Sequence, residues 1–309
     1  MKIHIPEIEL NTCNVCGARC YLCSAARGRG NVPLMTPDVF ARVIEQLHTI
    51  TFDVIQTSGN GDCFLNPHFM GYLRTLRREF PAATICNYSS FGMYSPAIAD
   101  AVIGERLIDK QFTRIDSLDE TTAARASGLN PRLVRGNLEH FVRHNRAIEL
   151  NIGYSSIQQY YRKCQQLLGH PPFHGPFTPV EADAMPDEFG VIQNHFGALN
   201  RDNPPTVARI NQSLWGEREH PLTKPDPTGV CPKLGLLERI VWICPDGTVD
   251  LCGYDDTQRA FETGNIMSQQ LIDIWTGPKR RKLLEDIRAR RWTDYPCNPT
   301  CCKMYRDDK

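Results

Sequence analysis

Hydrophobic and polar residues follow two different periods along the first two-thirds of the chain. Residues 3–10 alternate apolar and polar side chains, which predicts a strand. Further strands are expected at four short segments: 52–57, 82–87, 112–116 and 147–153. Apolar residues between strands recur at helical spacing, for example Val39, Phe40, Val43, Ile44 and Leu47, or Val134, Leu138, Phe141 and Val142. Strands that alternate with helices predict an α/β fold with a parallel sheet of right-handed βαβ units. About six such units favour a partial (β/α)6 TIM-like barrel over a closed eight-fold one.

The pattern changes in the last third of the chain. Residues 165–230 are rich in Pro, Gly and Asn, and only a strand at 190–199 is expected there. From Cys231 onward, residues 240–244 and 248–252 flank Pro245-Asp246-Gly247, which predicts a β-hairpin. A helix is expected from about Ser268. We therefore expect a barrel domain over residues 1–225 and a small hairpin-plus-helix domain over 226–309.

Composition and charge narrow the class of protein. The 309 residues are 41% hydrophobic and 23% charged, as in an ordinary globular protein with a core. The formal net charge is zero, so no global field attracts nucleic acid or an anionic membrane. No apolar run has the length of a membrane span, and the first ten residues are not typical of a signal peptide. Thirteen cysteines without an export signal favour a reducing cytoplasm and metal ligation over disulfides.

The cysteines are grouped near the two ends of the chain. Four lie between positions 13 and 23, and six lie between 231 and 302. The first group contains Cys16-x3-Cys20-x2-Cys23, directly after the first strand. Three thiolates on one tight loop hold three corners of a [4Fe–4S] cluster and leave one iron open to a ligand. The alternative is a structural zinc site with Cys13 as a fourth ligand.

This motif resembles the signature of the radical S-adenosylmethionine (SAM) enzymes. The resemblance implies that Cys16, Cys20 and Cys23 hold a [4Fe–4S] cluster whose open iron binds SAM. The loop from Ser58 to Pro67 is similar to the family's Gly-Gly-Glu-Pro loop, which receives the amino group of SAM. Asp62 stands where the family usually has Glu, and Cys63 where it usually has Pro. The cofactor-binding residues that the resemblance implies on this loop are Gly59, Gly61 and Asp62.

Two later segments extend the resemblance. Asn87 and Ser89 follow the third strand, where the family often contacts the ribose of SAM. Ser117 lies in Ile115-Asp116-Ser117-Leu118-Asp119, which resembles a family stretch whose serine reaches SAM. The simpler interpretation of each is a turn or helix cap.

The C-terminal cysteines resemble the SPASM or twitch extension of the same family. The order of cysteines and of the landmarks Gly264-Asn265-Ile266 and Leu271-x-x-Ile274-Trp275 matches that extension. The resemblance implies one auxiliary [4Fe–4S] cluster with four cysteine ligands: Cys231, Cys252, Cys297 and Cys301. Cys302 competes with Cys301 for the last position, and zinc is the alternative metal.

In size and layout the chain resembles twitch-bearing aminocyclitol dehydrogenases and aminoglycoside epimerases. That resemblance implies hydrogen abstraction from a small polar substrate, followed by oxidation with the auxiliary cluster as electron acceptor. The alternative is an epimerase or isomerase in which Cys244 donates a hydrogen atom, acting on a sugar, nucleoside or peptide. Arg201 is similar to an arginine found near substrate in the dehydrogenases, although a surface arginine is the simpler interpretation.

The expected partners are a small-molecule substrate and an electron donor such as flavodoxin or ferredoxin, with no membrane and no nucleic acid. A non-catalytic iron–sulfur or zinc protein is the competing class.

Overall fold

The computed structural model describes residues 2–23, 34–57, 60–172, 175–210, 234–253, 261–289 and 291. The chain divides into two compact units. The first contains residues 1–16, 27–86 and 224–309, and the second contains residues 17–26 and 87–223. No helix in the described part of the chain is long and apolar enough to cross a membrane.

The first unit joins the N-terminal strands to the C-terminal segment. Its strands are β1 (Glu7–Leu10), β2 (Val54–Thr57), β7 (Ile240–Ile243), β8 (Thr248–Asp250) and β9 (Glu262–Asn265), with β3 (Thr84–Tyr88) crossing the boundary between the units. Its helices are α1 (Pro37–Leu47), the short 3-10 helix η2 (Cys63–Leu65), α2 (Phe69–Glu79), α9 (Leu234–Leu237), α10 (Leu271–Trp275) and α11 (Pro278–Arg288). Strand β1 pairs in parallel with both β2 and β7, so Ile8 faces Ile55 on one side and Val241 on the other. The C-terminal hairpin is therefore a direct continuation of the barrel strands within this unit.

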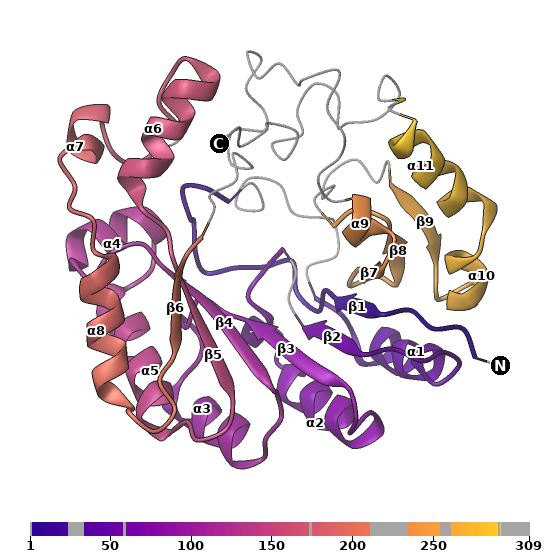
Figure 1. The fold of residues 1–309 in the computed structure, drawn as a ribbon. Helices are drawn as coiled ribbons and strands as arrows, with labels where there is room; N and C mark the ends of the chain where they lie inside the picture. The colour runs from indigo at the N-terminus through magenta and orange to yellow at the C-terminus, as the bar shows by residue number, and fades with distance from the viewer. Residues whose placement is uncertain are drawn as a thin grey trace. The chain divides into compact units, whose positions relative to one another are not determined.

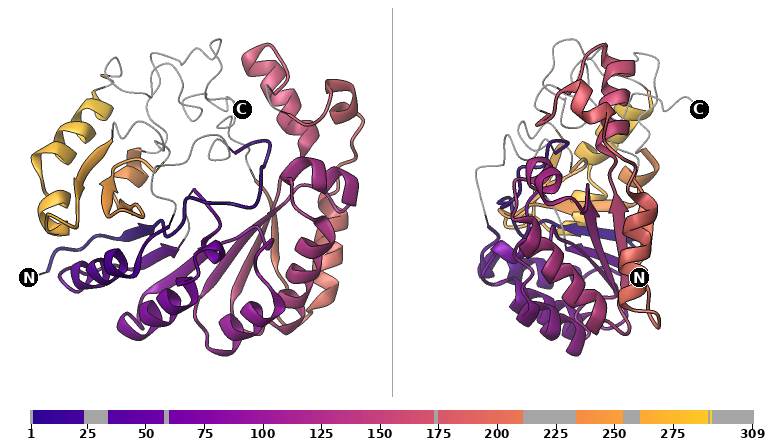
Figure 2. Two further views of the ribbon diagram at one scale, coloured as in Figure 1. Left: turned by 180° about the vertical axis from the view of Figure 1, so that it is seen from behind. Right: turned by 90° about the vertical axis from the view of Figure 1, so that its left-hand side faces the viewer.

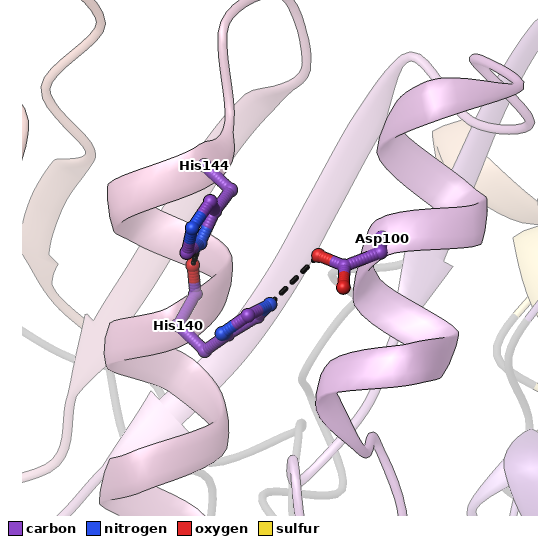
Figure 3. Close-up of side chains that lie close together, drawn as sticks. All are labelled: Asp100, His140 and His144. Carbon is purple, nitrogen blue, oxygen red and sulfur yellow. Dashed lines mark hydrogen bonds and ion pairs between the residues drawn. The ribbon is translucent and has the colours of Figure 1, made fainter.

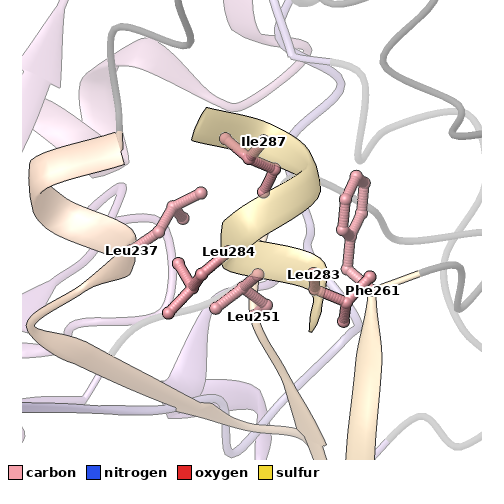
Figure 4. Packing of buried hydrophobic residues seen from close by; sticks show 6 residues of the cluster. All are labelled: Leu237, Leu251, Phe261, Leu283, Leu284 and Ile287. Carbon is pink, nitrogen blue, oxygen red and sulfur yellow. The ribbon is translucent and has the colours of Figure 1, made fainter. Parts of the chain in front are cut away.

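A small apolar core holds the C-terminal hairpin and helices together. It consists of Leu237, Leu251, Phe261, Leu283, Leu284 and Ile287, contributed by α9, the β8–β9 region and α11 (Figure 4). The segment that follows β9 is tied to α1 by hydrogen bonds. Leu271 N donates to Gln46 Oε1 over 2.7 Å, and Arg42 Nε donates to Ile266 O over 2.9 Å.

The second unit is a parallel sheet covered by helices. Its remaining elements are β4 (Lys110–Ile115), β5 (Glu149–Tyr154), β6 (Thr206–Arg209), α3 (Pro96–Gly104), α4 (Glu120–Ser127), α5 (Pro131–His144), α6 (Ile157–Leu168), α7 (Pro179–Asp183) and α8 (Phe189–Leu199). Strand β5 pairs in parallel with β4 and with β6. Figure 1 shows α3, α5 and α8 side by side against these strands, and Figure 2 shows the same arrangement from two further directions.

The expected strand at residues 190–199 is wrong, because this segment forms helix α8. Ile192 and Phe196 are four residues apart and both are fully buried, which is helical periodicity. The other expected strands, the hairpin around residues 245–247, the helices over 39–47 and 134–142 and the helix after Ser268 are confirmed.

Candidate active site

In the first unit, three functional segments start at one edge of the sheet. Strands β1, β2 and β7 are parallel, so their carboxyl ends lie at the same edge. The cysteine loop follows Leu10, the glycine-bearing loop follows Thr57, and Cys244 follows Ile243. Ligand sites of α/β folds lie at this carboxyl edge, because the loops there bring together side chains from different strands.

The glycine-bearing loop is packed directly on the start of the cysteine loop. Asp62 N donates to Val15 O over 2.8 Å. A Cβ atom on Gly61 would lie 2.3 Å from Val15 O and 2.5 Å from Cys13 O, which is closer than real Cβ contacts. Only glycine therefore allows the two loops to approach this closely.

Asp62 has a local structural role in addition to its expected one. Its side chain is buried and accepts a hydrogen bond from Phe64 N over 3.3 Å, which caps the 3-10 helix η2. A contact with SAM stays a prediction. Gly59 lies outside the described residues.

The cysteines of the motif are more exposed to solvent than the two cysteines next to them. Cys16, Cys20 and Cys23 are partly exposed, whereas Cys13 and Cys63 are buried. The Cys13 thiol donates to Val15 O over 3.1 Å and accepts from Val15 N over 3.3 Å. Cys13 thus shapes the turn that leads to Cys16.

In the second unit, the loop continues through Cys20 and Cys23 against helix α4. Arg19 N donates to Ser127 O over 2.7 Å, and Tyr21 N donates to Ala126 O over 3.1 Å. Cys23 N then donates to Cys20 O over 3.0 Å, which closes a tight turn between the two thiols. Backbone hydrogen bonds therefore fix the spacing of these cysteines without using their side chains.

A buried ion pair lies beside this turn. Arg114 Nη2, near the end of β4, is 3.1 Å from Asp116 Oδ2, and the guanidinium carbon is 6.0 Å from the centre of the Tyr21 ring. Burial alone would lower the pKa of Arg114, but the negative charge of Asp116 and, next, of Cys20 raises it above its usual range. Burial raises the pKa of Asp116, and Arg114 opposes that shift. The guanidinium is thus a fixed positive charge that faces the cysteine turn.

The Tyr21 side chain anchors the same segment. Its hydroxyl is 3.4 Å from Ser155 Oγ, just after β5, and its ring packs edge-on against Tyr160 at 5.1 Å between centroids. Burial, followed by the charge of Asp116, raises the pKa of Tyr21 well above its usual value. The neutral phenol therefore acts as a structural group that attaches the cysteine turn to the carboxyl edge of β4 and β5.

The expected SAM contacts from β3 and β4 have protein partners. The Ser117 hydroxyl donates to Glu188 Oε1, and Leu118 N donates to the other carboxylate oxygen of Glu188 over 2.7 Å. Ser89 Oγ accepts from Phe91 N over 3.1 Å, which supports the left-handed backbone of Phe91 at φ 60°. Asn87 is fully buried. Roles of Asn87, Ser89 and Ser117 toward SAM stay predictions.

Asn200 and Arg201 lie away from the carboxyl edge. They follow α8 and precede β6, which places them at the amino end of that strand. Asn200 is buried, and its amide donates to Val142 O and Asn145 O over 2.7 and 2.6 Å, next to the connection that leads into β5. Arg201 is exposed. Its position lends no support to a catalytic role.

The structure describes one of the four expected auxiliary ligands. Cys252 is partly exposed and packs against the apolar core of α9, β8–β9 and α11. Cys231, Cys297 and Cys301, as well as Cys302, lie outside the described residues. Gly247 has φ 82°, a left-handed conformation that favours glycine. A Cβ atom on the landmark residue Gly264 would lie 2.8 Å from Ile274 Cγ1, so Gly264 allows close packing of β9 on α10.

Sequence reasoning missed Arg114 and Glu188. Arg114 stands within a strand whose end is buried, two residues before Asp116, and such a pairing in a strand is a signal for a buried ion pair. Glu188 carried no signal, because it pairs with Ser117 across 71 residues of sequence.

Comparisons with known proteins agree with these observations. Residues 235–303 match the family model of SPASM, an iron–sulfur cluster-binding domain. No curated protein sequence is significantly similar to the chain.

Three solved structures have the same fold. BtrN in complex with AdoMet and 2-DOIA has a TM-score of 0.56 and 14% identity, over 98% of this chain and 93% of BtrN. Native anSMEcpe with bound AdoMet and Kp18Cys peptide has a TM-score of 0.59 and 13% identity, over 98% and 92%. SuiB from Streptococcus suis bound to precursor peptide SuiA has a TM-score of 0.56 and 10% identity, over 92% and 67%.

These findings confirm the expected resemblance and fold class. The chain has an α/β fold with a parallel sheet, like the partial barrels of radical SAM enzymes that carry SPASM or twitch domains. The expected iron–sulfur-binding extension at the C-terminal end is confirmed by the SPASM match. The division at residues 225 and 226 stays a prediction.

Proposed function

We propose that this chain, which combines the radical SAM fold with a SPASM domain, cleaves SAM reductively and abstracts a hydrogen atom from a small polar substrate. The observation that carries the proposal is that the glycine-bearing loop packs directly on the start of the cysteine loop, at the carboxyl edge of β1 and β2 in the first unit. There the backbone of Gly61 and Asp62 contacts the segment that leads to Cys16.

The residues present fit a [4Fe–4S] cluster. Cys16, Cys20 and Cys23 offer three partly exposed thiols on one loop, and thiolates are the usual ligands of such clusters. When bound, the cluster would supply the electron that splits SAM into methionine and a 5′-deoxyadenosyl radical. The turn that closes Cys23 on Cys20 presets the ligand spacing, and the Arg114 charge stabilises thiolates at that turn.

Oxidation is the favoured outcome because the chain carries a second cluster domain. Loss of a hydrogen atom and then of a proton leaves one electron on the substrate, and that electron requires an acceptor. Cys231, Cys252, Cys297 and Cys301 would hold an auxiliary [4Fe–4S] cluster that takes it. The SPASM match over residues 235–303 supports an iron–sulfur cluster in this region, and the proposed ligands Cys252, Cys297 and Cys301 lie within it.

The proposed substrate is an aminocyclitol- or aminoglycoside-like small molecule. BtrN, whose structure contains 2-DOIA, and this chain each cover more than nine-tenths of the other. The anSMEcpe structure, which contains a peptide, matches over a similar share, so a peptide is the alternative substrate. Mass spectrometry of the product separates the reactions: loss of two hydrogens indicates oxidation, and an unchanged mass indicates isomerisation.

An epimerase is the second candidate, and Cys244 is the observation that favours it. Cys244 is partly exposed and follows β7 at the carboxyl edge in the first unit. Its thiol donates to Asp250 Oδ2 over 3.2 Å. A thiol is a good hydrogen donor to a carbon radical, because its S–H bond is weaker than most C–H bonds.

The Cys244→Ala variant distinguishes the two candidates. For an oxidase, we expect near-normal turnover and no solvent deuterium in the product. Epimerisation predicts instead that the variant forms 5′-deoxyadenosine without inverted product, and that wild-type product takes up deuterium at one carbon. Cys164→Ala is the matched control, because Cys164 is a buried cysteine on α6, away from the strand ends.

A further inference from the structure

Three side chains on the outer helices of the second unit have the composition of a metal site. They are Asp100 on α3 and His140 and His144 on α5. Each offers one ligand atom, and these atoms lie within 4.8 Å of one another. Figure 3 shows the two imidazoles one above the other along α5, tilted relative to each other, and the Asp100 carboxylate facing His140 from α3.

The helix geometry explains why the histidines meet. Residues four apart lie on the same face of an α-helix, one turn above the other. The rings of His140 and His144 are accordingly 4.2 Å apart between centroids. Helices α3 and α5 pack together through buried residues such as Ala99 and Phe141, and this packing brings Asp100 to the histidine pair.

Hydrogen bonds orient the imidazoles. His144 Nδ1 is 2.8 Å from His140 O, a carbonyl that can only accept, so Nδ1 carries the proton and the lone pair is on Nε2. A backbone carbonyl that fixes the tautomer in this way is a common feature of histidine metal ligands. His140 Nε2 is 2.7 Å from Asp100 Oδ1, so these two atoms are already adjacent.

We propose that Asp100, His140 and His144 bind one divalent cation of the zinc type, which links α3 to α5. Two imidazoles and one carboxylate suit zinc, copper or nickel, whereas magnesium and calcium prefer oxygen ligands. Ligand atoms of a tetrahedral zinc lie ~3.3 Å apart, so a small change of side-chain rotamer closes the present spacing. Water completes the coordination, because Asp100 and His144 are exposed.

The proposal is independent of the radical chemistry, since no cysteine of the cluster motifs takes part. The role of the bound cation is structural, because a cation that binds only the folded state stabilises that state by mass action. Because the ligands come from two helices and from residues forty apart in sequence, the cation restrains their separation.

Zinc binding to the anaerobically reconstituted protein tests the site. Equilibrium dialysis against micromolar zinc, followed by elemental analysis, measures zinc per chain in the wild type and in His144→Ala and Asp100→Asn. We expect each variant to bind one zinc fewer than the wild type, with unchanged iron content. The matched control is His195→Ala on α8, which removes an imidazole paired with Glu139 and should bind as much zinc as the wild type.

Thermal unfolding gives a second measurement that does not count zinc. Zinc should raise the unfolding temperature of the wild type and of His195→Ala, and leave that of His144→Ala unchanged. Equal zinc content in the wild type and His144→Ala would overturn the proposal. So would a loss of zinc in His195→Ala as large as that in His144→Ala.

Discussion

At the scale of single residues, the conformation of the cysteine loop depends on contacts made by its neighbours. Gly61 allows one loop to lie on the backbone of another, and Cys13 uses its thiol to shape a turn. Arg114 adds a fixed positive charge beside Cys20 and Cys23. Substitutions of Gly61 and Arg114 test two of these roles.

Gly61→Ala should disrupt the N-terminal cluster site. The new Cβ would lie 2.3 Å from Val15 O, and a backbone oxygen cannot move away without displacing the cysteine loop. We expect the variant to lose about half of its iron and most SAM cleavage, as measured by iron analysis and 5′-deoxyadenosine formation.

Gly71→Ala is the control for this substitution. Gly71 lies on α2 with nothing within 4 Å of a new Cβ, so alanine should keep full iron content. Alanine in place of an exposed helical glycine should also stabilise the fold by about 1 kcal/mol. Full iron content in Gly61→Ala would contradict the assigned role of the loop.

Arg114→Met should lower the midpoint potential of the N-terminal cluster. A nearby positive charge favours the reduced form, which carries one more electron, so its removal disfavours reduction. A potentiometric titration followed by electron paramagnetic resonance measures the shift. Arg114→Lys keeps the charge and should shift the potential less. Identical potentials in the wild type and Arg114→Met would show that the guanidinium does not act on the cluster.

At the scale of elements, the sequence predicts the regular barrel segments because their burial follows one simple period. Strands β2 and β5 alternate buried and more exposed residues, and helices α1, α2 and α5 bury residues at helical spacing. Helix α8 was missed because glycines at positions 190 and 197 obscure a stripe of only a few buried residues. The close packing of Gly61 on the cysteine loop and the pairing of Ser117 with Glu188 could not be predicted, because each joins segments that are distant in sequence.

Helix α11 is held in place by the buried side chain of Arg280. Arg280 lies over the Trp275 ring at 3.5 Å and donates to Leu237 O over 3.0 Å, which ties α11 to α9 and α10. Burial, followed by the neighbouring charge of Arg288, lowers the pKa of Arg280 to about 10. It therefore remains charged at neutral pH.

Arg280→Ala should destabilise the C-terminal part of the first unit. Loss of the ring contact and of the hydrogen bonds to backbone carbonyls should cost on the order of 2 kcal/mol. Thermal unfolding followed by circular dichroism measures the change. Arg281→Ala, at the exposed neighbouring position, should unfold at nearly the wild-type temperature. Equal unfolding temperatures for the two variants would argue against a structural role of the Arg280 contacts.

At the scale of the whole molecule, the C-terminal extension is built onto the barrel strands. Within the first unit β7 extends the parallel pairing of β1, and the hairpin β7–β8 carries Cys244 and leads to Cys252. The proposed function therefore assigns SAM cleavage to the three-cysteine loop and a second cluster to the C-terminal cysteines.

The direct test is SAM cleavage by the reconstituted protein under anaerobic conditions with dithionite. The wild type should contain about eight irons per chain, as two four-iron clusters require, and should form 5′-deoxyadenosine. The Cys16→Ala/Cys20→Ala/Cys23→Ala variant should keep about half of that iron and form none, whereas Cys164→Ala should behave as the wild type. Unchanged iron in the triple variant, or no 5′-deoxyadenosine from a fully loaded wild type, would contradict the account.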